Sequence, residues 1–153
     1  MKQDHSLLAT VCEPVMFDNP RRNLKLAHQL LQIMRRERGL GLAANQVGIN
    51  QRLFVMCVDD VYRHCFNPTI LEHSDNEVVM KEGCLSFPGE FCDISRPERV
   101  LAQWHDASGK QHQEWLTGWH SRCFQHELDH LNGVVMQQRV TSLVCIAQQP
   151  QFQ

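Results

Sequence analysis

Two histidines four residues apart, His126 and His130, constrain this chain more than any other feature. Positions i and i+4 of an α-helix project from the same side, so a helix lets both imidazoles reach one metal ion. Glu127 then lies about 100° round the helix from His126, near the ion without having to bind it. A general base for a metal-activated water stands at such a position. The segment HELDH therefore predicts a helix, and it favours a metal site over a chance coincidence.

A third ligand has to come from elsewhere in the chain. After His130 there is no Asp, Glu or His, and Met136 stands where one class of metallopeptidases has its third histidine. Cys145 is the only downstream alternative, so the ligand is expected upstream. Cys84, in the segment EGCLS, is the candidate, because a thiolate and two imidazoles leave the fourth position of a catalytic ion open for water. Taken alone, the position of Cys84 favours one more ordinary buried thiol over a metal ligand.

A glycine-rich segment, GLGLAANQ at residues 39–46, follows an expected helix. A dinucleotide-binding loop needs a strand before it, a helix after it and a third glycine, so phosphate binding is not favoured here. Gln46 ends the segment with an uncharged amide donor that can polarise a carbonyl oxygen.

Composition limits the class of protein. A chain of 153 residues with 42% apolar and 21% charged residues is neither disordered nor membrane-embedded and is long enough for one compact domain. We expect a single catalytic domain over residues 1–153, with about 141–153 as a short frayed tail. The longest apolar run, Leu53–Val58, is far below the ~18 residues of a membrane span. No signal peptide is evident, and seven cysteines without a CxxC pair indicate reduced thiols. These features predict a cytoplasmic protein.

Net charge gives no general reason to expect nucleic acid or membrane partners. Fifteen basic and 17 acidic residues leave a formal charge of −2, and binding to phosphate backbones or anionic lipids usually depends on a positive surface. The arginines at 35, 36 and 38 are interpreted as a solvated helix end near the negative pole of the helix dipole, rather than as a partner surface.

The spacing of apolar residues predicts one helix at each end of residues 18–133 and strands between them. The first helix begins at Asp18-Asn19-Pro20 and ends at Gly39; the second is capped by Thr117 and runs to about Asn132, with Gly133 as its stop. The expected strands cover residues 53–58, 62–66, 77–80, 99–106 and 111–115. This order predicts an α+β fold, with antiparallel β-sheets packed around a central metal-binding helix and one N-terminal helix.

Three motifs together, GLGLAANQ, EGCLS and QHELDH, resemble the signature motifs of the peptide deformylases, in the same order and over about residues 13–136. The resemblance implies a hydrolase of protein biosynthesis that removes the N-formyl group from the formyl-methionine of new polypeptides and releases formate. It implies one divalent ion, most often Fe²⁺, with Zn²⁺, Ni²⁺ or Co²⁺ able to substitute. The implied ligands are Cys84, His126 and His130.

The resemblance also assigns roles to other residues. A metal-bound water attacks the formyl carbon, with Glu127 as general base and then acid, while the Gln46 amide and the Leu85 backbone N–H stabilise the oxyanion. The residues implied in substrate binding are an apolar methionine pocket and two backbone contacts, namely Leu40, Trp119 and Cys123 with Gly41 and Gly89. For Trp119 and Cys123, ordinary core packing is an equal alternative. Arg96 and Asp129 are expected to form an ion pair that orients the site.

Some features depart from the family pattern and leave alternatives open. We expect a short member of the family with reduced N- and C-terminal extensions. N-formylmethionyl peptides or nascent chains are the expected partners, and ribosome contact is left open because the family's longer C-terminal helix is not expected here. The loop at residues 89–93 also differs. An amidase or peptidase acting on other acylated amines is the neighbouring alternative. A non-catalytic binding protein is disfavoured, because Glu127, Gln46 and all three ligands are present.

Overall fold

A computed structural model describes residues 5–140 of the chain. Its elements follow in the order α1 (Pro20–Arg36), β1 (Gly41–Ala43), the 3₁₀ turn η1 (Ala44–Val47), β2 (Leu53–Val58), β3 (Val61–His73), β4 (Glu77–Cys84), β5 (Phe87–Pro97), β6 (Val100–His105), β7 (Gln111–Leu116), α2 (Gly118–Leu131) and the 3₁₀ turn η2 (Met136–Arg139). The expected tail at residues 141–153 lies outside the described residues, so the single-domain assignment stays a prediction.

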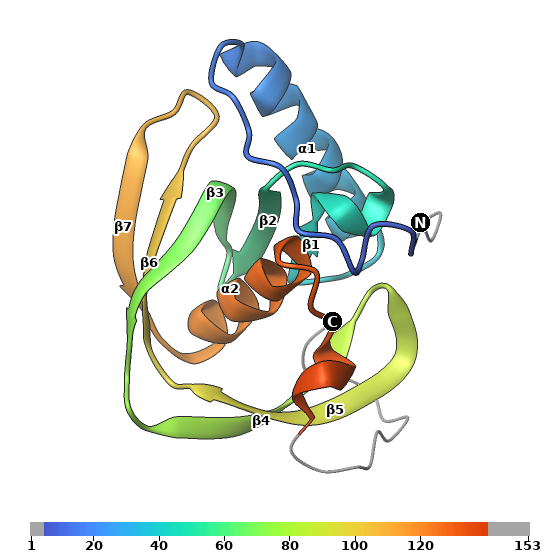
Figure 1. Cartoon of the computed structure of the whole chain (residues 1–153), viewed down its shortest axis with the longest axis vertical. Helices are drawn as coiled ribbons and strands as arrows, with labels where there is room; N and C mark the ends of the chain where they lie inside the picture. The colour runs from blue at the N-terminus through green and yellow to red at the C-terminus, as the bar shows by residue number, and fades with distance from the viewer. Residues whose placement is uncertain (1–4, 141–153) are drawn as a thin grey trace.

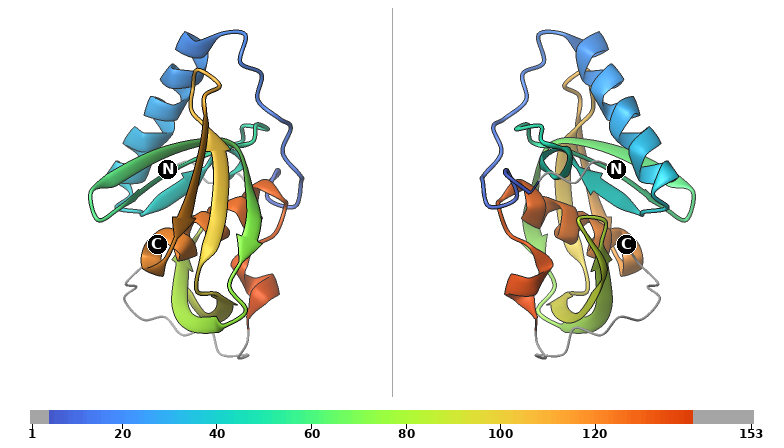
Figure 2. Two further views of the ribbon diagram at one scale, coloured as in Figure 1. Left: turned by 90° about the vertical axis from the view of Figure 1, so that its left-hand side faces the viewer. Right: turned by 90° about the vertical axis from the view of Figure 1, so that its right-hand side faces the viewer.

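All strand pairs are antiparallel and form two sheets (Figure 1). Five strands make one sheet in the order β1-β2-β3-β6-β7, and β4 and β5 form a separate long hairpin. Helix α2 lies between the sheet and the hairpin, while α1 packs along the outside of β2 (Figures 1 and 2). This arrangement confirms the predicted α+β class, with antiparallel sheets around a central helix and one N-terminal helix.

Strand β2 is buried on both faces, which explains its uninterrupted apolar sequence. Leu53 and Val55 pack under α1, whereas Phe54 and Met56 face α2. The Phe54 ring meets Phe124 of α2 edge to face, with 5.1 Å between centroids. One strand therefore joins the two main parts of the core.

Helix α1 begins as predicted but ends earlier. The Asn19 side chain accepts the Arg22 backbone N–H (3.0 Å), and Pro20 takes the first helical position, where a missing N–H costs nothing. Helix α1 stops at Arg36, and the reversal is made by Arg38, with φ of 60°, rather than by Gly39. Gly39 follows it and donates its N–H to the Met34 carbonyl (2.9 Å).

Strand β3 continues beyond Phe66, where the prediction ended it. Asn67 adopts a φ of 46°, and the pairing with β6 shifts register between Phe66 and Thr69. The Asn67 side chain accepts the Val15 N–H (2.7 Å) and donates to the Val15 carbonyl (3.0 Å). The bulge lets the strand continue through Asn67-Pro68, a pair of residues that predicts a strand end from sequence alone.

Strand β5 was not predicted at all, because Pro88, Gly89 and Asp93 interrupt any alternating pattern. It pairs with β4 along its length, from Glu77 opposite Pro97 to Cys84 opposite Phe87. The two strands form the hairpin that carries Cys84 towards α2.

Helix α2 is buried over Ser121–Leu131, unlike an ordinary surface helix. Thr117 occupies the predicted cap position, with extended backbone but no capping hydrogen bond from its side chain. Gly133 ends the helix as predicted, with φ of 74°, and a Cβ there would lie 2.9 Å from the Ala9 backbone. Within residues 5–140, no helix is long and apolar enough to cross a membrane.

Candidate metal centre

The three predicted ligands lie together. Cys84 ends β4, while His126 and His130 project from one face of α2. Their ligand atoms all lie within 4.8 Å of one another and all three residues are buried. The Cys84 Sγ is 3.2 Å from the His130 Nε2. One thiolate and two imidazoles form a donor set that fits Zn²⁺ or Fe²⁺, so the residues present suit a divalent ion.

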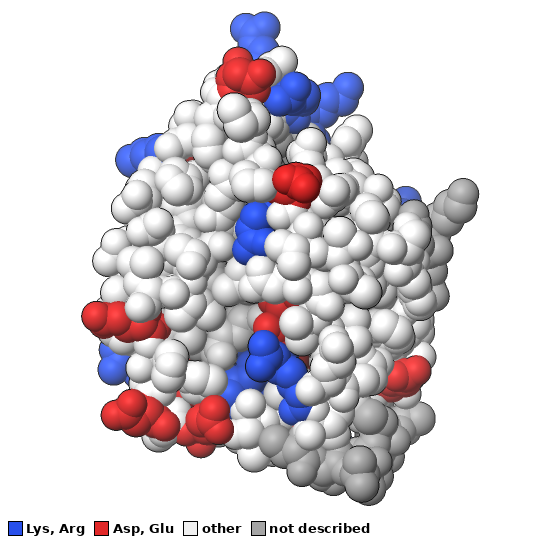
Figure 3. Space-filling view, viewed as in Figure 1, with Lys and Arg blue, Asp and Glu red and all other residues white. Residues whose placement is uncertain are grey.

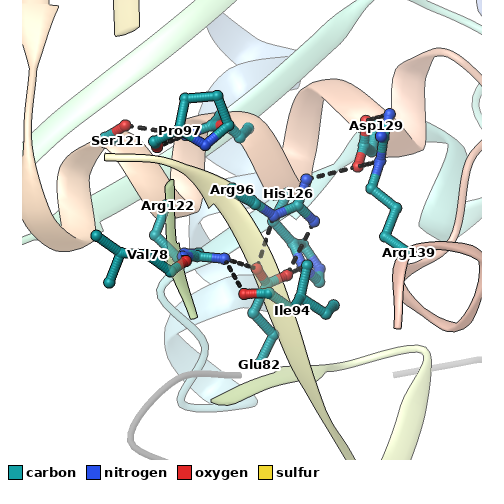
Figure 4. A network of polar contacts seen from close by, with 11 residues as sticks. Val78, Glu82, Ile94, Arg96, Pro97, Ser121, Arg122, His126, Asp129 and Arg139 are labelled. Carbon is teal, nitrogen blue, oxygen red and sulfur yellow. Dashed lines mark hydrogen bonds and ion pairs between the residues drawn. The ribbon is translucent and has the colours of Figure 1, made fainter. Parts of the chain in front are cut away.

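A buried carboxylate, Glu82, fixes the orientation of His126 (Figure 4). His126 donates its Nδ1–H to Glu82 Oε1 (2.8 Å), so the other ring nitrogen is the one that can act as a metal ligand. Metal-ligating histidines are commonly held in this way by a carboxylate. Glu82 precedes Cys84 by two residues in β4, so both side chains leave the strand on the same side.

Two buried arginines hold Glu82 in turn (Figure 4). Arg96 donates to both carboxylate oxygens, at 2.7 and 3.0 Å. Arg122 donates Nη1–H to Glu82 Oε2 (2.9 Å) and to the Ile94 carbonyl (2.9 Å). Burial alone would raise the pKa of Glu82, but the hydrogen bonds with His126 and Arg96 outweigh it and hold the pKa well below its usual range. Glu82 is therefore ionised.

The Arg96–Asp129 ion pair expected from the sequence is confirmed. Arg96 Nη1 lies 2.7 Å from Asp129 Oδ2, and Arg139 donates to both oxygens of the same carboxylate, at 2.6 and 2.9 Å. Asp129 immediately precedes His130, so this chain of contacts links the two histidines through charged groups on β4, β5 and α2, and Arg139 of η2 holds Asp129 from the side.

Glu127 is buried beside the ligands. Its Oε2 has no hydrogen-bond partner among the described residues, and burial, partly opposed by His126, raises its pKa to about 7. Gly41 faces it closely: a Cβ at this position would lie 2.7 Å from Glu127 Oε1 and 2.9 Å from Cys123 Sγ. Glycine is therefore required at position 41, because α2, the helix that carries His126 and His130, approaches it closely.

Gln46 and Leu85 also lie at the ligands. Gln46 accepts the Ala43 N–H through Oε1 (2.8 Å) and donates Nε2–H to Ser86 Oγ (3.0 Å). The same Nε2 is 3.6 Å from Cys84 Sγ. Leu85 follows Cys84 in the buried turn between β4 and β5. Both predicted oxyanion donors therefore belong to residues next to the ligand thiol.

The predicted substrate-binding residues divide into two groups. Leu40 and Trp119 are partly buried and pack against the core cluster that contains Cys123, whose Sγ is 3.6 Å from the Leu40 carbonyl oxygen. Gly89, in contrast, is exposed in the irregular start of β5 with a φ of +81°, and no atom lies within 4 Å of a Cβ built there. The structure does not bring Gly89 into contact with the others.

Comparison with known proteins decides the family. The family model for polypeptide deformylase matches residues 1–144. The chain belongs to this family. Peptide deformylase 2 of Gloeobacter violaceus is 42% identical over 130 residues, which cover 82% of this chain and 70% of the relative. Peptide deformylase of Thermotoga petrophila is 43% identical over 117 residues, covering 76% and 71%.

Solved structures agree with the family assignment. The crystal structure of peptide deformylase from Thermotoga maritima superposes with a TM-score of 0.85 at 40% identity, covering 89% of this chain and 92% of that one. The deformylase of Synechococcus elongatus, solved in complex with actinonin, gives 0.84 at 36% identity, covering 92% and 76%. Deformylases are metallohydrolases that act on the N-formyl group of new polypeptides, so the enzyme class expected from the three motifs is confirmed.

Sequence reasoning missed the residues that support the ligands, chiefly Glu82, Arg122 and Arg139. For two of these residues, the sequence spacing relative to a ligand could have predicted a position near the site. Glu82 has the strand spacing that places it on the same side as Cys84, and Arg122 lies four residues before His126 on the same helix face. Arg139 could not have been predicted in this way, because its contact with Asp129 depends on the path of η2.

Proposed function

We propose that this deformylase acts on the N-terminal formyl-methionine of peptides and nascent chains in the cytoplasm and releases formate. The observation that carries the proposal is the meeting of Cys84, His126 and His130 beside the unpaired Oε2 of Glu127. These three residues would hold one divalent ion. Fe²⁺ is the ion we propose, and the sulfur and nitrogen donors also suit Zn²⁺, Ni²⁺ or Co²⁺.

When bound, the ion would act as a Lewis acid and make water nucleophilic near neutral pH. Glu127 Oε2 would take a proton from the attacking water and later give it to the leaving amine, so one residue serves as base and then acid. Burial raises the pKa of this carboxyl, whereas a bound cation would lower it, and these opposing effects would keep the group able to accept and return a proton. The Gln46 amide and the Leu85 backbone N–H would donate to the oxygen on which negative charge develops.

The remaining residues bind and orient. Leu40, Trp119 and Cys123 would form the apolar wall that receives the methionine side chain, which their common packing supports. Backbone groups at Gly41 and Gly89 would pair with the extended peptide in the manner of a strand. Glu82 would keep His126 directed at the ion.

The test is amine release from formyl-Met-Ala-Ser by protein prepared without oxygen and loaded with Fe²⁺ or Ni²⁺. We expect turnover of the formyl peptide and none of the matching acetyl peptide. Glu127→Ala should abolish turnover while the chain still binds one ion. An ion bound at one per chain with no turnover of the formyl peptide would contradict the proposed substrate and leave only the metal site.

A further inference from the structure

The charge of the chain is unevenly distributed along its length. Residues 20–38, which form α1 and the turn after it, contain six basic residues and one acidic residue, a formal charge of +5. The rest of the chain contains nine basic and 16 acidic residues, a formal charge of −7. The overall charge of −2 is therefore the sum of a strongly basic helical segment and an acidic remainder of the chain. Figure 3 shows basic side chains over the start of α1, while most acidic side chains in that view lie lower.

The basic residues of α1 share its outer face. Ala27, Leu30, Leu31 and Met34 form the buried side, and the opposite side is exposed along the length of the helix. We call this exposed side the cationic stripe; its members recur at spacings of three or four and are Arg21, Lys25, His28, Gln32, Arg35 and Arg36. The stripe extends over about 22 Å at 1.5 Å per residue. Among the elements of residues 5–140, none lies over the outer side of α1 in the side views (Figure 2).

The charges at the start of the stripe are not neutralised within the described structure. Arg22, beside the stripe, pairs with Asp18 (3.0 Å), and Arg36 lies 3.8 Å from Glu37. For Arg21 and Lys25, no carboxylate among residues 5–140 lies within ion-pair distance. Both line a shallow depression together with His28, Gln29 and Gln32. The donors in this depression are therefore available to an anionic partner.

We propose that the cationic stripe docks the enzyme on an RNA phosphate backbone. The stripe places Arg21 and Lys25 at one end and Arg35 and Arg36 at the other, with no carboxylate among its members. Such a spacing of positive charges matches a phosphate backbone, and arginine binds phosphate with paired donors. A membrane surface fits less well, because an interfacial helix buries an apolar face in the lipid. The apolar face of α1 is already in the core, and Leu24 is the one large apolar side chain exposed on its described length.

Docking through α1 leaves the candidate metal centre accessible. The ligands and their neighbours come from β1, η1, β4 and α2, and none comes from α1. The inference rests on the proposed function in one respect. Nascent chains are made on ribosomes, whose surface is largely RNA, so an RNA-docking helix would hold the enzyme near its substrates without occupying the site.

The experiment compares two double variants of the metal-loaded full chain. One is Arg21→Gln/Lys25→Gln on the stripe, and the other, called the sheet variant, is Arg99→Gln/Lys110→Gln in the loops before and after β6. Both remove one arginine and one lysine, so the net charge changes equally. Binding to a labelled 20-base-pair RNA duplex is measured between 50 and 200 mM salt. We expect the stripe variant to bind at least tenfold more weakly, with a salt slope smaller by about two, because each phosphate contact contributes roughly 0.7–0.9. The sheet variant should bind like the original chain.

Other outcomes overturn the inference. No binding of the original chain to the duplex at 50 mM salt, or equal losses in the two variants, would refute docking through α1. Stronger binding to phosphatidylserine vesicles or to polyglutamate than to RNA would assign the stripe to a membrane or to an acidic protein. Turnover of free formyl-Met-Ala-Ser is measured separately and should be unchanged in both variants. Failure of that turnover in the original chain, with RNA binding intact, would refute the proposed substrate alone.

Discussion

Gly41 is the point at which the first motif and the metal helix approach most closely. A Cβ here would lie 2.7 Å from Glu127 Oε1 and 2.8 Å from Glu127 Cγ, so Gly41→Ala must displace the proposed base. A displacement of about 1 Å costs roughly 100-fold in rate, and we expect kcat for the formyl peptide to fall by about that factor. Metal content, measured by elemental analysis, should stay at one ion per chain.

Gly118→Ala is the matched control. No atom lies within 4 Å of a Cβ at Gly118, but its φ is +57°. The variant should lose about 1 kcal/mol of unfolding free energy through backbone strain and keep its kcat. Equal loss of kcat in both variants would mean that Gly41 is not needed for the position of Glu127.

Arg122 holds the carboxylate that orients His126, although it touches neither metal ligand nor substrate. Arg122→Met would leave Glu82 with Arg96 as its one arginine partner, so His126 would be less firmly directed. We expect metal affinity, measured by competition with a chromogenic chelator, to fall 10- to 100-fold. Arg122→Lys keeps the positive charge and should recover part of the lost metal affinity.

Arg139→Met provides the comparison, because Arg139 belongs to the same network but contacts Asp129 and is 47% exposed. Its removal should change the unfolding free energy by no more than about 1 kcal/mol and metal affinity little. If Arg122→Met lowers unfolding free energy but leaves metal affinity as it was, Arg122 serves the fold alone.

At the scale of elements, the sequence predicts best what is determined locally. Helix α2 could be placed because its periodicity, cap position and Gly133 all lie within one stretch of chain. Strand β5 and the second half of β3 could not, because Pro88-Gly89 and Asn67-Pro68 end strands in most contexts. Strand pairing overrides both signals, with the neighbouring strand β4 in the case of β5 and with the distant strand β6 in the case of β3. The same distinction holds at the site: HELDH is local, whereas the contacts of Glu82 join three separate elements.

The bulge in β3 gives a test of this dependence on distant partners. Asn67→Ala removes both hydrogen bonds with the Val15 backbone and places alanine at a φ of 46°. We expect a loss of about 2–3 kcal/mol in unfolding free energy, from the unmade bonds and the strained backbone. Urea denaturation measures this loss. Asn50→Ala, which removes an exposed bond to the Glu13 N–H (3.2 Å), should cost less than about 1 kcal/mol.

At the scale of the whole molecule, the basic helix α1 and the acidic remainder of the chain share one apolar core. The basic helix α1 packs on the sheet through apolar residues. Polar side chains also meet across this boundary, where the Arg35 guanidinium of α1 lies 4.6 Å from the centre of the Tyr62 ring of β3. The rings of His28 on α1 and His64 on β3 meet at nearly right angles, with 5.6 Å between centroids. A positive charge on His64 at this half-buried contact would oppose the packing of α1.

This contact makes stability depend on pH in a defined direction. Burial, with a smaller contribution from His28, lowers the pKa of His64 below its usual 6.5. As the pH falls below about 6.5, the unfolded chain therefore binds a proton at His64 before the folded chain does, and unfolding free energy falls. For one such group the slope is at most about 1.4 kcal/mol per pH unit. His64→Gln should lose less unfolding free energy than the original chain between pH 7.5 and 5.5, in urea titrations at constant salt. The comparison cancels the titration of the metal ligands, which both chains share, so equal losses would show that the His28–His64 contact tolerates protonation.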